Sequence, residues 1–375
     1  EVSVEEVTLS PQALLSQTQT VDSTGDVGQY SSIVLNSLGN PVISYYDGTK
    51  SFPGTTNSVG NGDLKLMVCG NPSCSSGNTI TTVDRGTTHY TDDVGKYNAL
   101  VLNSRGLPVI SYFDRGNGLM LAQCRDVTCT SKSIRKVTGQ TNIIDTSLVL
   151  DPSGYPVIAI TAESFNASGR SVAFSLIRCG REDCSIINSV RPVDAGEYIS
   201  LALNRYDAPV ISYYDARGGN LLVANCDRAR DCSTKTIQTI DSTGDVGQYT
   251  SLILVPSRNN LGQITGQRPL ISYYDVTNGD LKVVYCGNDA CSQNNVVHTV
   301  DSAGNVGQYT SLKWELGTDP TISYYDATNG DLKVAICDPG SPYAKVPTTP
   351  CQEKQYNTIG TVDNTGDVGQ DNSLA

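Results

Sequence analysis

The chain has 375 residues, with 26 Lys and Arg against 38 Asp and Glu, which gives a formal net charge of −12. This acidic balance excludes nucleic acid as an expected partner, because binding nucleic acid requires clustered cations. No apolar run approaches the roughly 20 residues that span a bilayer, and the 35 glycines with only 17% charged residues suit short strands and tight turns.

Residues 1–16 precede the first repeat and form an N-terminal extension. Four apolar residues between Val2 and Leu9 are interleaved with polar ones, a pattern typical of a β-strand. A chain that starts at Glu1 fits a mature product whose signal peptide has been removed. We therefore treat the extension as a candidate strand that could be exchanged with another molecule.

A short motif dominates the sequence from residue 41 onward. Pro41–Asp47 reads Pro-Val-Ile-Ser-Tyr-Tyr-Asp, and copies of it follow at a mean spacing of about 56 residues. The copies are Pro108–Asp114, Pro209–Asp215, Pro269–Asp275 and Pro320–Asp326, with a weaker one beginning at Pro156 in which Ala162 takes the Asp position. This period is close to the length of one four-stranded blade in propeller repeats.

Each repeat contains four short runs rich in β-branched and aromatic residues. In the fifth copy they are Tyr249–Val255, Leu270–Tyr274, Leu281–Tyr285 and Val296–Val300. Six such units predict an all-β fold, a six-bladed β-propeller of four-stranded antiparallel blades over residues 17–363, because radial closure hides the sheet edges. The chain resembles the repeat-type β-propellers over nearly its whole length, without pointing to one subfamily. A seven-bladed ring, or a part of a longer array, is the alternative.

The 12 cysteines follow the same period, with one pair in each repeat that brackets the connection between the third and fourth strands. The pairs are Cys69/Cys74, Cys124/Cys129, Cys179/Cys184, Cys226/Cys232, Cys286/Cys291 and Cys337/Cys351. Two cysteines that flank a short hairpin loop come within disulfide reach, whereas pairs spread around a ring cannot converge on one metal ion. We therefore predict six disulfides and an extracellular location, either secreted or on the cell surface. The sequon at Asn166 is a candidate glycosylation site.

A second motif, Asp-Ser-Thr-Gly-Asp-Val-Gly-Gln-Tyr, precedes the first strand of several repeats. It occurs at residues 22–30 and 241–249, and at 301–309 with small changes. Two interpretations remain open: its carboxylates bond local backbone amides in Asx turns, or they coordinate Ca²⁺ with turn carbonyls. The candidate calcium ligands are Asp22, Asp26, Asp241, Asp245 and Asp301. We expect no other cofactor.

The repeated tyrosine pair and the scarcity of histidine bear on function. Adjacent strand residues point to opposite faces of a blade, so the two tyrosines are predicted to pack against the two neighbouring blades. Neither His89 nor His298 has the sequence context of a catalytic triad or a metal site. We see no catalytic constellation and expect that the chain is not an enzyme. Two carboxylates on different blades could still form a glycosidase, and the third repeat departs from the pattern at 158–163 and 166–170.

The two ends of the chain duplicate each other. Val21–Gln29 and Val362–Gln370 both read Val-Asp-x-Thr-Gly-Asp-Val-Gly-Gln, which leaves residues 364–375 as a C-terminal partial repeat. The N-terminal copy could complete the last blade and leave this segment spare, the chain could belong to a longer array, or the segment could complete a neighbouring molecule.

These features predict a structural or adhesive surface protein, a homo-polymer that assembles into fibres through terminal strand exchange. The alternative is a carbohydrate-binding, lectin-like propeller with glycans as partners. A secreted glycoside hydrolase is the third interpretation.

Overall fold

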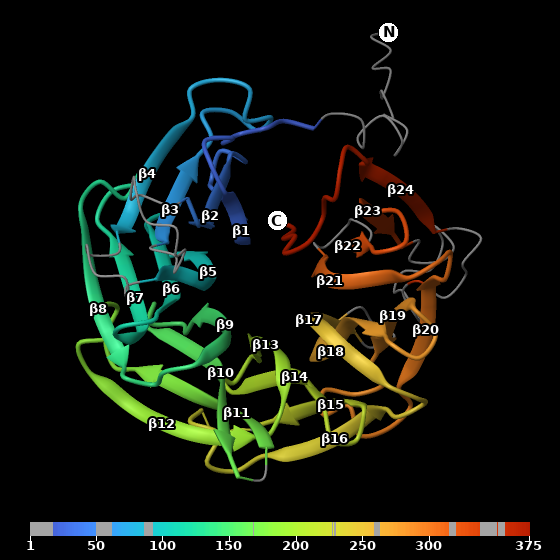
Figure 1. The fold of residues 1–375 in the computed structure, drawn as a ribbon. Coiled ribbons are helices and arrows are strands. Elements are labelled where there is room, and N and C mark those ends of the chain that lie inside the picture. The colour runs from blue at the N-terminus through green and yellow to red at the C-terminus, as the bar shows by residue number, and fades with distance from the viewer. Residues whose placement is uncertain are drawn as a thin grey trace, which may run out of the picture.

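In the computed structural model, the described residues form 24 β-strands in six separate four-stranded sheets, arranged around a centre (Figure 1). The structure describes residues 18–49, 62–85, 93–167, 169–226, 228, 230–258, 263–314, 320–337, 351 and 357–375. The N-terminal extension and His89 lie outside this set. Within it, no helix has the length and apolar character needed to cross a membrane. The predictions of an all-β fold and a six-bladed β-propeller are confirmed.

The strands follow each other from the centre to the rim in every blade. Blade 1 consists of β1 (Val27–Leu35), β2 (Pro41–Asp47), β3 (Asp63–Val68) and β4 (Thr79–Arg85), and blade 2 of β5 (Val94–Leu102), β6 (Pro108–Asp114), β7 (Gly118–Cys124) and β8 (Lys132–Thr138). Blade 3 consists of β9 (Ile143–Leu150), β10 (Pro156–Asn166), β11 (Gly169–Cys179) and β12 (Ile187–Asp194), and blade 4 of β13 (Glu197–Leu203), β14 (Pro209–Asp215), β15 (Asn220–Asn225) and β16 (Thr236–Asp241). Blade 5 consists of β17 (Val246–Arg258), β18 (Ile264–Asp275), β19 (Asp280–Tyr285) and β20 (Val296–Asp301), and blade 6 of β21 (Val306–Lys313), β22 (Thr321–Asp326), β23 (Asp331–Ile336) and β24 (Thr358–Asp363).

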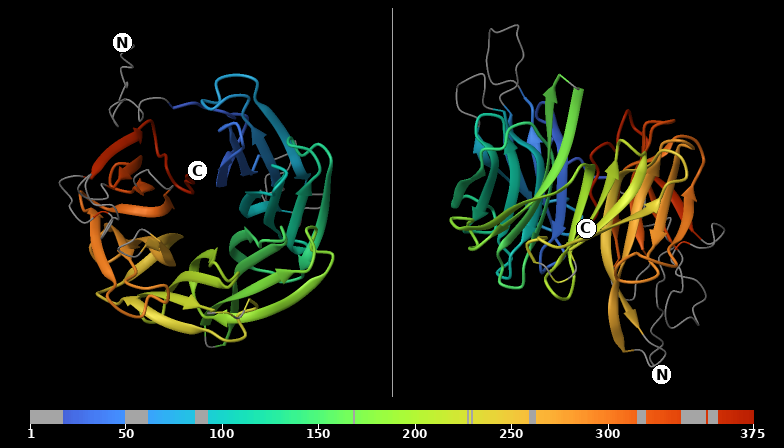
Figure 2. Two further views of the ribbon diagram at one scale, coloured as in Figure 1. Left: turned by 180° about the vertical axis from the view of Figure 1, so that it is seen from behind. Right: turned by 90° about the horizontal axis from the view of Figure 1, so that it is seen from below.

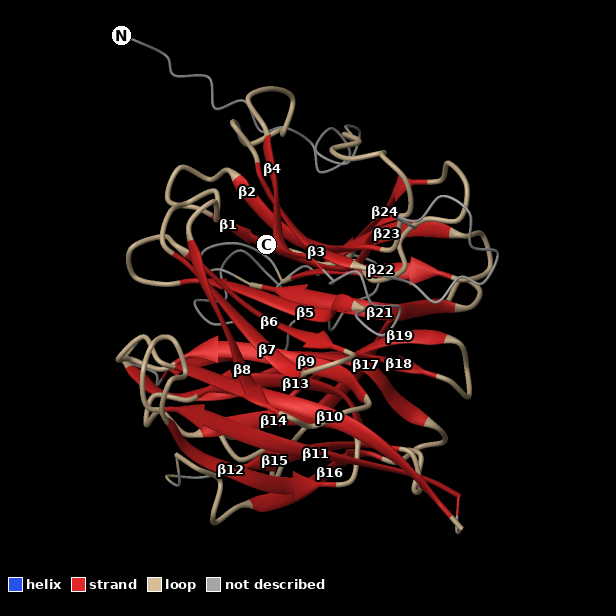
Figure 3. Cartoon of the chain, turned by 60° about the vertical axis from the view of Figure 1, so that its left-hand side comes forward, coloured by secondary structure: helices blue, strands red, loops and turns tan. Residues whose placement is uncertain are grey.

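Blade 3 carries the most extended hairpin on its side of the ring. Strands β10 and β11 continue well past their neighbours, which Figure 3 shows clearly. The hairpin coincides with the region where the third repeat departs from the motif. The side chain of Asn166 and the residue Ser168 at its tip lie outside the description, so the glycosylation prediction is not tested.

The hydrophobic core lies between neighbouring blades. Five clusters of buried side chains fill the five interfaces from blades 1 and 2 to blades 5 and 6. The motif tyrosines belong to this packing, since Tyr112, Tyr213, Tyr273 and Tyr324 have no exposed surface. The prediction that the tyrosine pairs pack between blades is therefore confirmed.

All six predicted disulfides are present, one in each blade. They join Cys69 to Cys74, Cys124 to Cys129, Cys179 to Cys184, Cys226 to Cys232, Cys286 to Cys291, and Cys337 to Cys351. Five of them have a sequence separation of only 5 or 6 residues, and the last has one of 14. Short loops restrict the unfolded chain only modestly, so each bridge acts as a local staple. Six disulfides are consistent with an extracellular location.

The position of the second cysteine in each pair corrects the expectation that the pairs bracket the connection between the third and fourth strands. The first cysteine ends or directly follows the third strand, but the second lies inside the connection, before the fourth strand begins. All six second cysteines have the left-handed backbone conformation, with φ between 50° and 61°: Cys74, Cys129, Cys184, Cys232, Cys291 and Cys351.

A tight turn accounts for this position. The backbone N–H of Cys74 donates to Asn71 O at 3.0 Å, and that of Cys129 donates to Asp126 O at 3.1 Å, each three residues back along the chain. The turn folds the second cysteine back onto the first, so the disulfide closes the turn rather than joining the ends of two paired strands. The spacing of the cysteines predicts the disulfide. The left-handed backbone conformation of the second cysteine, which makes the disulfide possible, is seen only in the structure.

The C-terminal segment of residues 364–375 lies inside the ring, between the inner strands of the last and the first blade (Figure 2, left). Inner strands are joined by a backbone N–H that donates to a serine hydroxyl of the preceding blade. The donor–acceptor pairs are Leu100–Ser32 (3.1 Å), Leu201–Ser147 (3.1 Å), Leu252–Ser200 (2.9 Å) and Leu312–Ser251 (3.0 Å). Leu374 donates to Ser311 at 3.0 Å and Ile33 to Ser373 at 3.2 Å, so the C-terminal segment closes the ring as an additional inner segment.

Candidate functional site

A repeated backbone irregularity turns one tyrosine of most blades toward the centre. In β17, the sequence Val-Gly-Gln-Tyr places Gly247 at φ 110° and Tyr249 at φ 54°, and the register with β18 shifts at the same point. A bulge of this kind re-aims a side chain that a regular strand would keep in the blade. Positive φ values also occur at Tyr30, Tyr97, Tyr198 and Tyr309.

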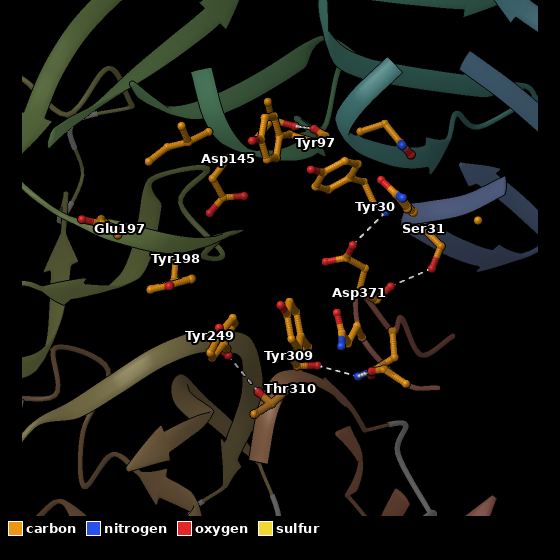
Figure 4. Close-up of a pocket in the computed structure, with 18 of the residues that line it drawn as sticks. Tyr30, Ser31, Tyr97, Asp145, Glu197, Tyr198, Tyr249, Tyr309, Thr310 and Asp371 are labelled. Atoms are coloured by element: carbon orange, nitrogen blue, oxygen red, sulfur yellow. Dashed lines mark hydrogen bonds between the residues drawn. The ribbon is translucent and has the colours of Figure 1, made fainter. Parts of the chain in front are cut away.

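These side chains surround a central cavity of about 1120 Å³ (Figure 4). The inner segments supply one residue each at the same position of the repeat, in the order Tyr30, Tyr97, Asp145, Tyr198, Tyr249, Tyr309 and Asp371. Neighbouring tyrosine rings contact each other, with centroids 4.5 Å apart for Tyr198–Tyr249 and for Tyr249–Tyr309. The cavity wall therefore consists of an aromatic arc interrupted by two aspartates.

Asp145 on β9 replaces the tyrosine of blade 3. Loss of hydration raises the pKa of its carboxyl from 3.8 to about 7, although backbone N–H groups of Ile199 and Thr146 bond the charged form. The donor–acceptor distance from Ile199 N to Asp145 Oδ2 is 2.8 Å. A carboxyl with this pKa holds its proton in part of the molecules at neutral pH, so it can act as an acid or a base there.

Asp371 in the C-terminal segment stands across the cavity from Asp145 (Figure 4). Its Oδ2 accepts the backbone N–H of Tyr30 at 3.2 Å, and its carbonyl accepts the hydroxyl of Ser31 at 2.8 Å. Loss of hydration also raises the pKa of Asp371. The segment that closes the ring thus contributes a carboxylate to the cavity.

A third acidic group at the cavity is held by an arginine. Arg170 from β11 donates its Nη1 to Glu197 Oε1 at 2.6 Å and its Nε to Glu163 Oε2 at 2.8 Å. The two carboxylates raise the pKa of Arg170, so its charge persists. Arg170 and Glu163 lie on the extended hairpin of blade 3, and Glu197 replaces the glutamine that other repeats carry before the tyrosine.

The predicted calcium ligands do not come together. Asp22, Asp241 and Asp301 accept the hydroxyls of Tyr45, Tyr273 and Tyr324 at 2.7 Å in three different blade interfaces. Asp245 accepts the Tyr214 hydroxyl at 2.7 Å, and Asp26 is exposed. No group of three or more His, Cys, Asp or Glu suited to a metal occurs within the described part of the chain. Calcium binding stays a prediction.

His298 lies in the rim strand β20, and burial lowers the pKa of its imidazole. It does not line the central cavity. None of the acidic residues that line the central cavity was predicted from the sequence, although three of them can be recognised there. Asp145, Glu197 and Asp371 are each a departure from the repeat, and a comparison of the repeats position by position would have found them.

No protein-family model and no curated protein sequence matches the chain. Solved structures with a similar arrangement include a protein of unknown function from Dyadobacter fermentans, with 12% identity, a TM-score of 0.52, and coverage of 79% of this chain and 90% of that one. They also include an alpha-L-arabinanase of Penicillium chrysogenum complexed with arabinobiose (9% identity, TM-score 0.49, coverage 89% and 93%). A third is the GH93 alpha-L-arabinofuranosidase of Fusarium graminearum (10% identity, TM-score 0.48, coverage of 89% of this chain and 92% of that one). At these identities the likeness shows the propeller fold alone.

The prediction that the chain is not an enzyme is corrected by these findings. It rested on the lack of a catalytic constellation in the sequence, but carboxylates from three separate segments line one cavity. The sequence does not reveal this site, because the carboxylates lie far apart along the chain and only ring closure brings them together.

Proposed function

We propose that the chain is an extracellular glycoside hydrolase that binds a carbohydrate in the central cavity. One observation carries the proposal: Asp145, with a pKa raised to about 7, and Asp371 face one tyrosine-lined cavity from opposite sides. Glycoside hydrolysis uses two carboxyl groups whose environments keep them in different protonation states. Asp145 and Asp371, on separate segments of one cavity wall, supply the two carboxyl groups for this chemistry.

In the proposed reaction, Asp145 donates its proton to the glycosidic oxygen while the bond from that oxygen to the anomeric carbon breaks. In its ionised form, Asp371 either takes a proton from the water that attacks the anomeric carbon, or bonds that carbon directly; in the second route, water then displaces Asp371 from the carbon while Asp145, now ionised, takes the proton of that water. The tyrosine rings offer apolar contact to sugar faces, and their hydroxyls, with Thr250 and Thr310 nearby, offer hydrogen bonds. Arg170 and Glu197 add a polar anchor at one side of the cavity.

The test is a panel of oligosaccharides whose leaving group is a sugar hydroxyl, including arabino-, galacto- and sialo-oligosaccharides, assayed by release of reducing sugar with the native chain and Asp145→Asn. We expect the substitution to lower kcat about 10²- to 10⁴-fold, because it removes general acid catalysis. KM should change little, since Asn keeps the shape of the side chain. The exposed Asp126→Asn variant, in a disulfide loop, is the matched control and should keep full activity. Equal activity of Asp145→Asn and the native chain would contradict the proposal.

A glycan-binding role in the same cavity is the second candidate. It is favoured by the fact that Asp145 and Asp371 each accept a backbone N–H from another inner segment, which gives both a structural reason to be present. A glycan array with native chain and Tyr249→Ala separates the two, because binding without turnover of any bound glycan would support this candidate. The fibre-forming, adhesive role draws no support from the described contacts, since the C-terminal segment bonds its own ring.

A further inference from the structure

The ring contains a seventh sector, between blades 6 and 1, that the described residues fill only in part. Each of the five other blade-to-blade interfaces has a full hydrophobic cluster, whereas the outer face of blade 1 has only a small one around Tyr45 and Met67. Ile43 on that face stays partly exposed. Its counterparts on the other motif strands have no exposed surface: Ile110, Ile158, Ile211, Ile271 and Ile322.

A regular blade is held by the two hydroxyls of its tyrosine pair. In blade 5, the Tyr273 hydroxyl donates backward to Asp241 Oδ2, at the end of the previous blade's rim strand, at 2.7 Å. The Tyr274 hydroxyl donates forward to Asn305 Oδ1, just before the next blade's inner strand, at 2.5 Å. Lys282 on the third strand pairs with Asp275 of its own hairpin at 2.6 Å and also lies 3.8 Å from the backward acceptor Asp241. Blades 1, 4 and 6 use their tyrosine pairs in the same way.

Both ends of the chain continue this pattern into the seventh sector. Asp22 accepts the Tyr45 hydroxyl at 2.7 Å, as the end of a rim strand does elsewhere, and Asp367 accepts the Tyr325 hydroxyl at 2.6 Å, as the start of an inner strand does. Val368 N donates to Gly330 O at 2.9 Å, matching the bond from Val306 N to Gly279 O. The segments 18–22 and 364–374 therefore occupy the rim and inner positions of a seventh blade. Neither pairs with a strand among the described residues.

The two side-chain acceptors that would hold the middle of this blade are not used by a tyrosine of the described residues. Asp363 ends β24, as Asp241 ends β16, but the hydrogen bond recorded for its carboxylate comes from Thr365 N at 2.9 Å. Asp26 precedes β1, and its exposed carboxylate meets the Gln29 amide at 3.4 Å. Leu374 is partly exposed, whereas its counterparts Leu100, Leu201, Leu252 and Leu312 are buried.

We propose that the seventh sector is a docking site for a β-hairpin of the type that forms the middle of the other blades. One strand of this hairpin carries an adjacent tyrosine pair whose hydroxyls bond Asp363 and Asp26. Its other strand carries a lysine that approaches Asp363, as Lys282 approaches Asp241. The inner segment 364–374 and the rim segment 18–22 offer backbone groups on either side, so the hairpin adds by β-augmentation. A lysine-bearing hairpin fits best, because in blades 1, 5 and 6 the hairpin lysine lies within 3.8 Å of the carboxylate that corresponds to Asp363.

The direct test adds a peptide of sequence Pro269–Tyr285 to the 375-residue chain and measures binding by isothermal titration calorimetry. We expect saturable binding. Peptides with Tyr273→Phe or Tyr274→Phe should bind about tenfold more weakly, the usual effect of one hydrogen bond to a charged group. Asp26→Asn and Asp363→Asn in the protein should weaken binding by a similar factor. Glu182→Gln, an exposed carboxylate of blade 3, is the control and should leave binding unchanged.

An isolated hairpin is only marginally stable in water, so a tethered version gives a second measurement. Residues Lys313–Ile336, which carry Tyr324, Tyr325 and Lys333, are appended after Leu374, whose counterpart in blade 6 is Leu312. The tether raises the local hairpin concentration to the millimolar range, so the melting temperature should rise by several degrees. Phenylalanine at both appended tyrosines should abolish most of the rise. The proposal is overturned if the peptide does not bind and the tether does not raise the melting temperature. It is also overturned if the Asp26 and Asp363 variants bind the peptide as tightly as the native chain, or if binding requires removal of residues 1–16.

Discussion

Replacing Asp145 by asparagine should change the pH dependence of stability in a direction that the cavity dictates. Loss of hydration raises the pKa of Asp145 from 3.8 to about 7. The folded protein therefore holds a proton that the unfolded chain releases between these two values. The stability that comes from this proton is fully present below about pH 4 and is lost as the pH rises through 7. Asparagine removes the ionisation and keeps an acceptor for Ile199 N.

The size of the effect follows from the shift of about 3 pKa units. At about 1.4 kcal/mol per unit, the upper limit is ~4 kcal/mol. Asp145 keeps part of its surface in contact with the solvent of the cavity, so we take half of this value, ~2 kcal/mol. For a chain of this length, 1 kcal/mol corresponds to roughly 1.5–2 °C in melting temperature. About two of the three units are lost between pH 5 and pH 8.5, so the melting temperature of Asp145→Asn relative to the native chain should rise by about 2–3 °C across this window.

Differential scanning calorimetry of both proteins at the two pH values is the assay. Asp126→Asn is a control in which the pKa shift has the opposite direction. Hydrogen bonds from Ser131 N and the Thr130 side chain hold the pKa of Asp126 below its usual range. Its stabilising effect is lost only as the pH falls through that lowered pKa, so this variant should show the same deficit at pH 5 and pH 8.5. A pH-independent difference for Asp145→Asn would refute the reasoning and remove the proposed general acid.

Three further predictions concern the ring. Deletion of residues 371–375 removes the bonds that close the ring on β1, so the melting temperature should fall by several degrees in a thermal scan; no change would mean that closure contributes nothing. Tyr213→Phe removes the hydroxyl that bonds Asp194 and should cost about 1–3 kcal/mol in denaturant unfolding, whereas the exposed Tyr206→Phe should cost nothing measurable. The double variant Cys179→Ala/Cys184→Ala should lose only about 2 kcal/mol, because the disulfide closes a short loop; a loss of folding would contradict its role as a local staple.

The repeat let the sequence predict the fold closely. A motif such as Pro269–Asp275 combines a strand-forming run with bulky residues on both faces, and only stacking of equal blades buries both faces. The cysteine pairs could be predicted for a related reason, since their short separations bring them together within one connection. These inferences depend on contacts that are local in sequence, and local contacts are what a sequence pattern encodes.

The candidate site could not be predicted in the same way. Asp145, Glu197 and Asp371 come from three different segments, and nothing in their immediate neighbours marks them as partners. Their meeting depends on bulged inner strands that turn one side chain of each repeat toward the centre, and on the curvature of the whole ring. Burial in that shared cavity is also what raises the pKa of Asp145.

The chain ends show the same division. The sequence by itself determined that Val21–Gln29 and Val362–Gln370 are copies of one unit, and that six repeats leave one copy over. Only the tertiary structure decided where that copy lies, with Ser373 and Asp371 bonded to β1 inside the ring. The reason is physical: a duplicated segment satisfies the same hydrogen bonds in its own ring, in a longer array or in a neighbouring molecule, and only the closure geometry of the folded ring distinguishes among them.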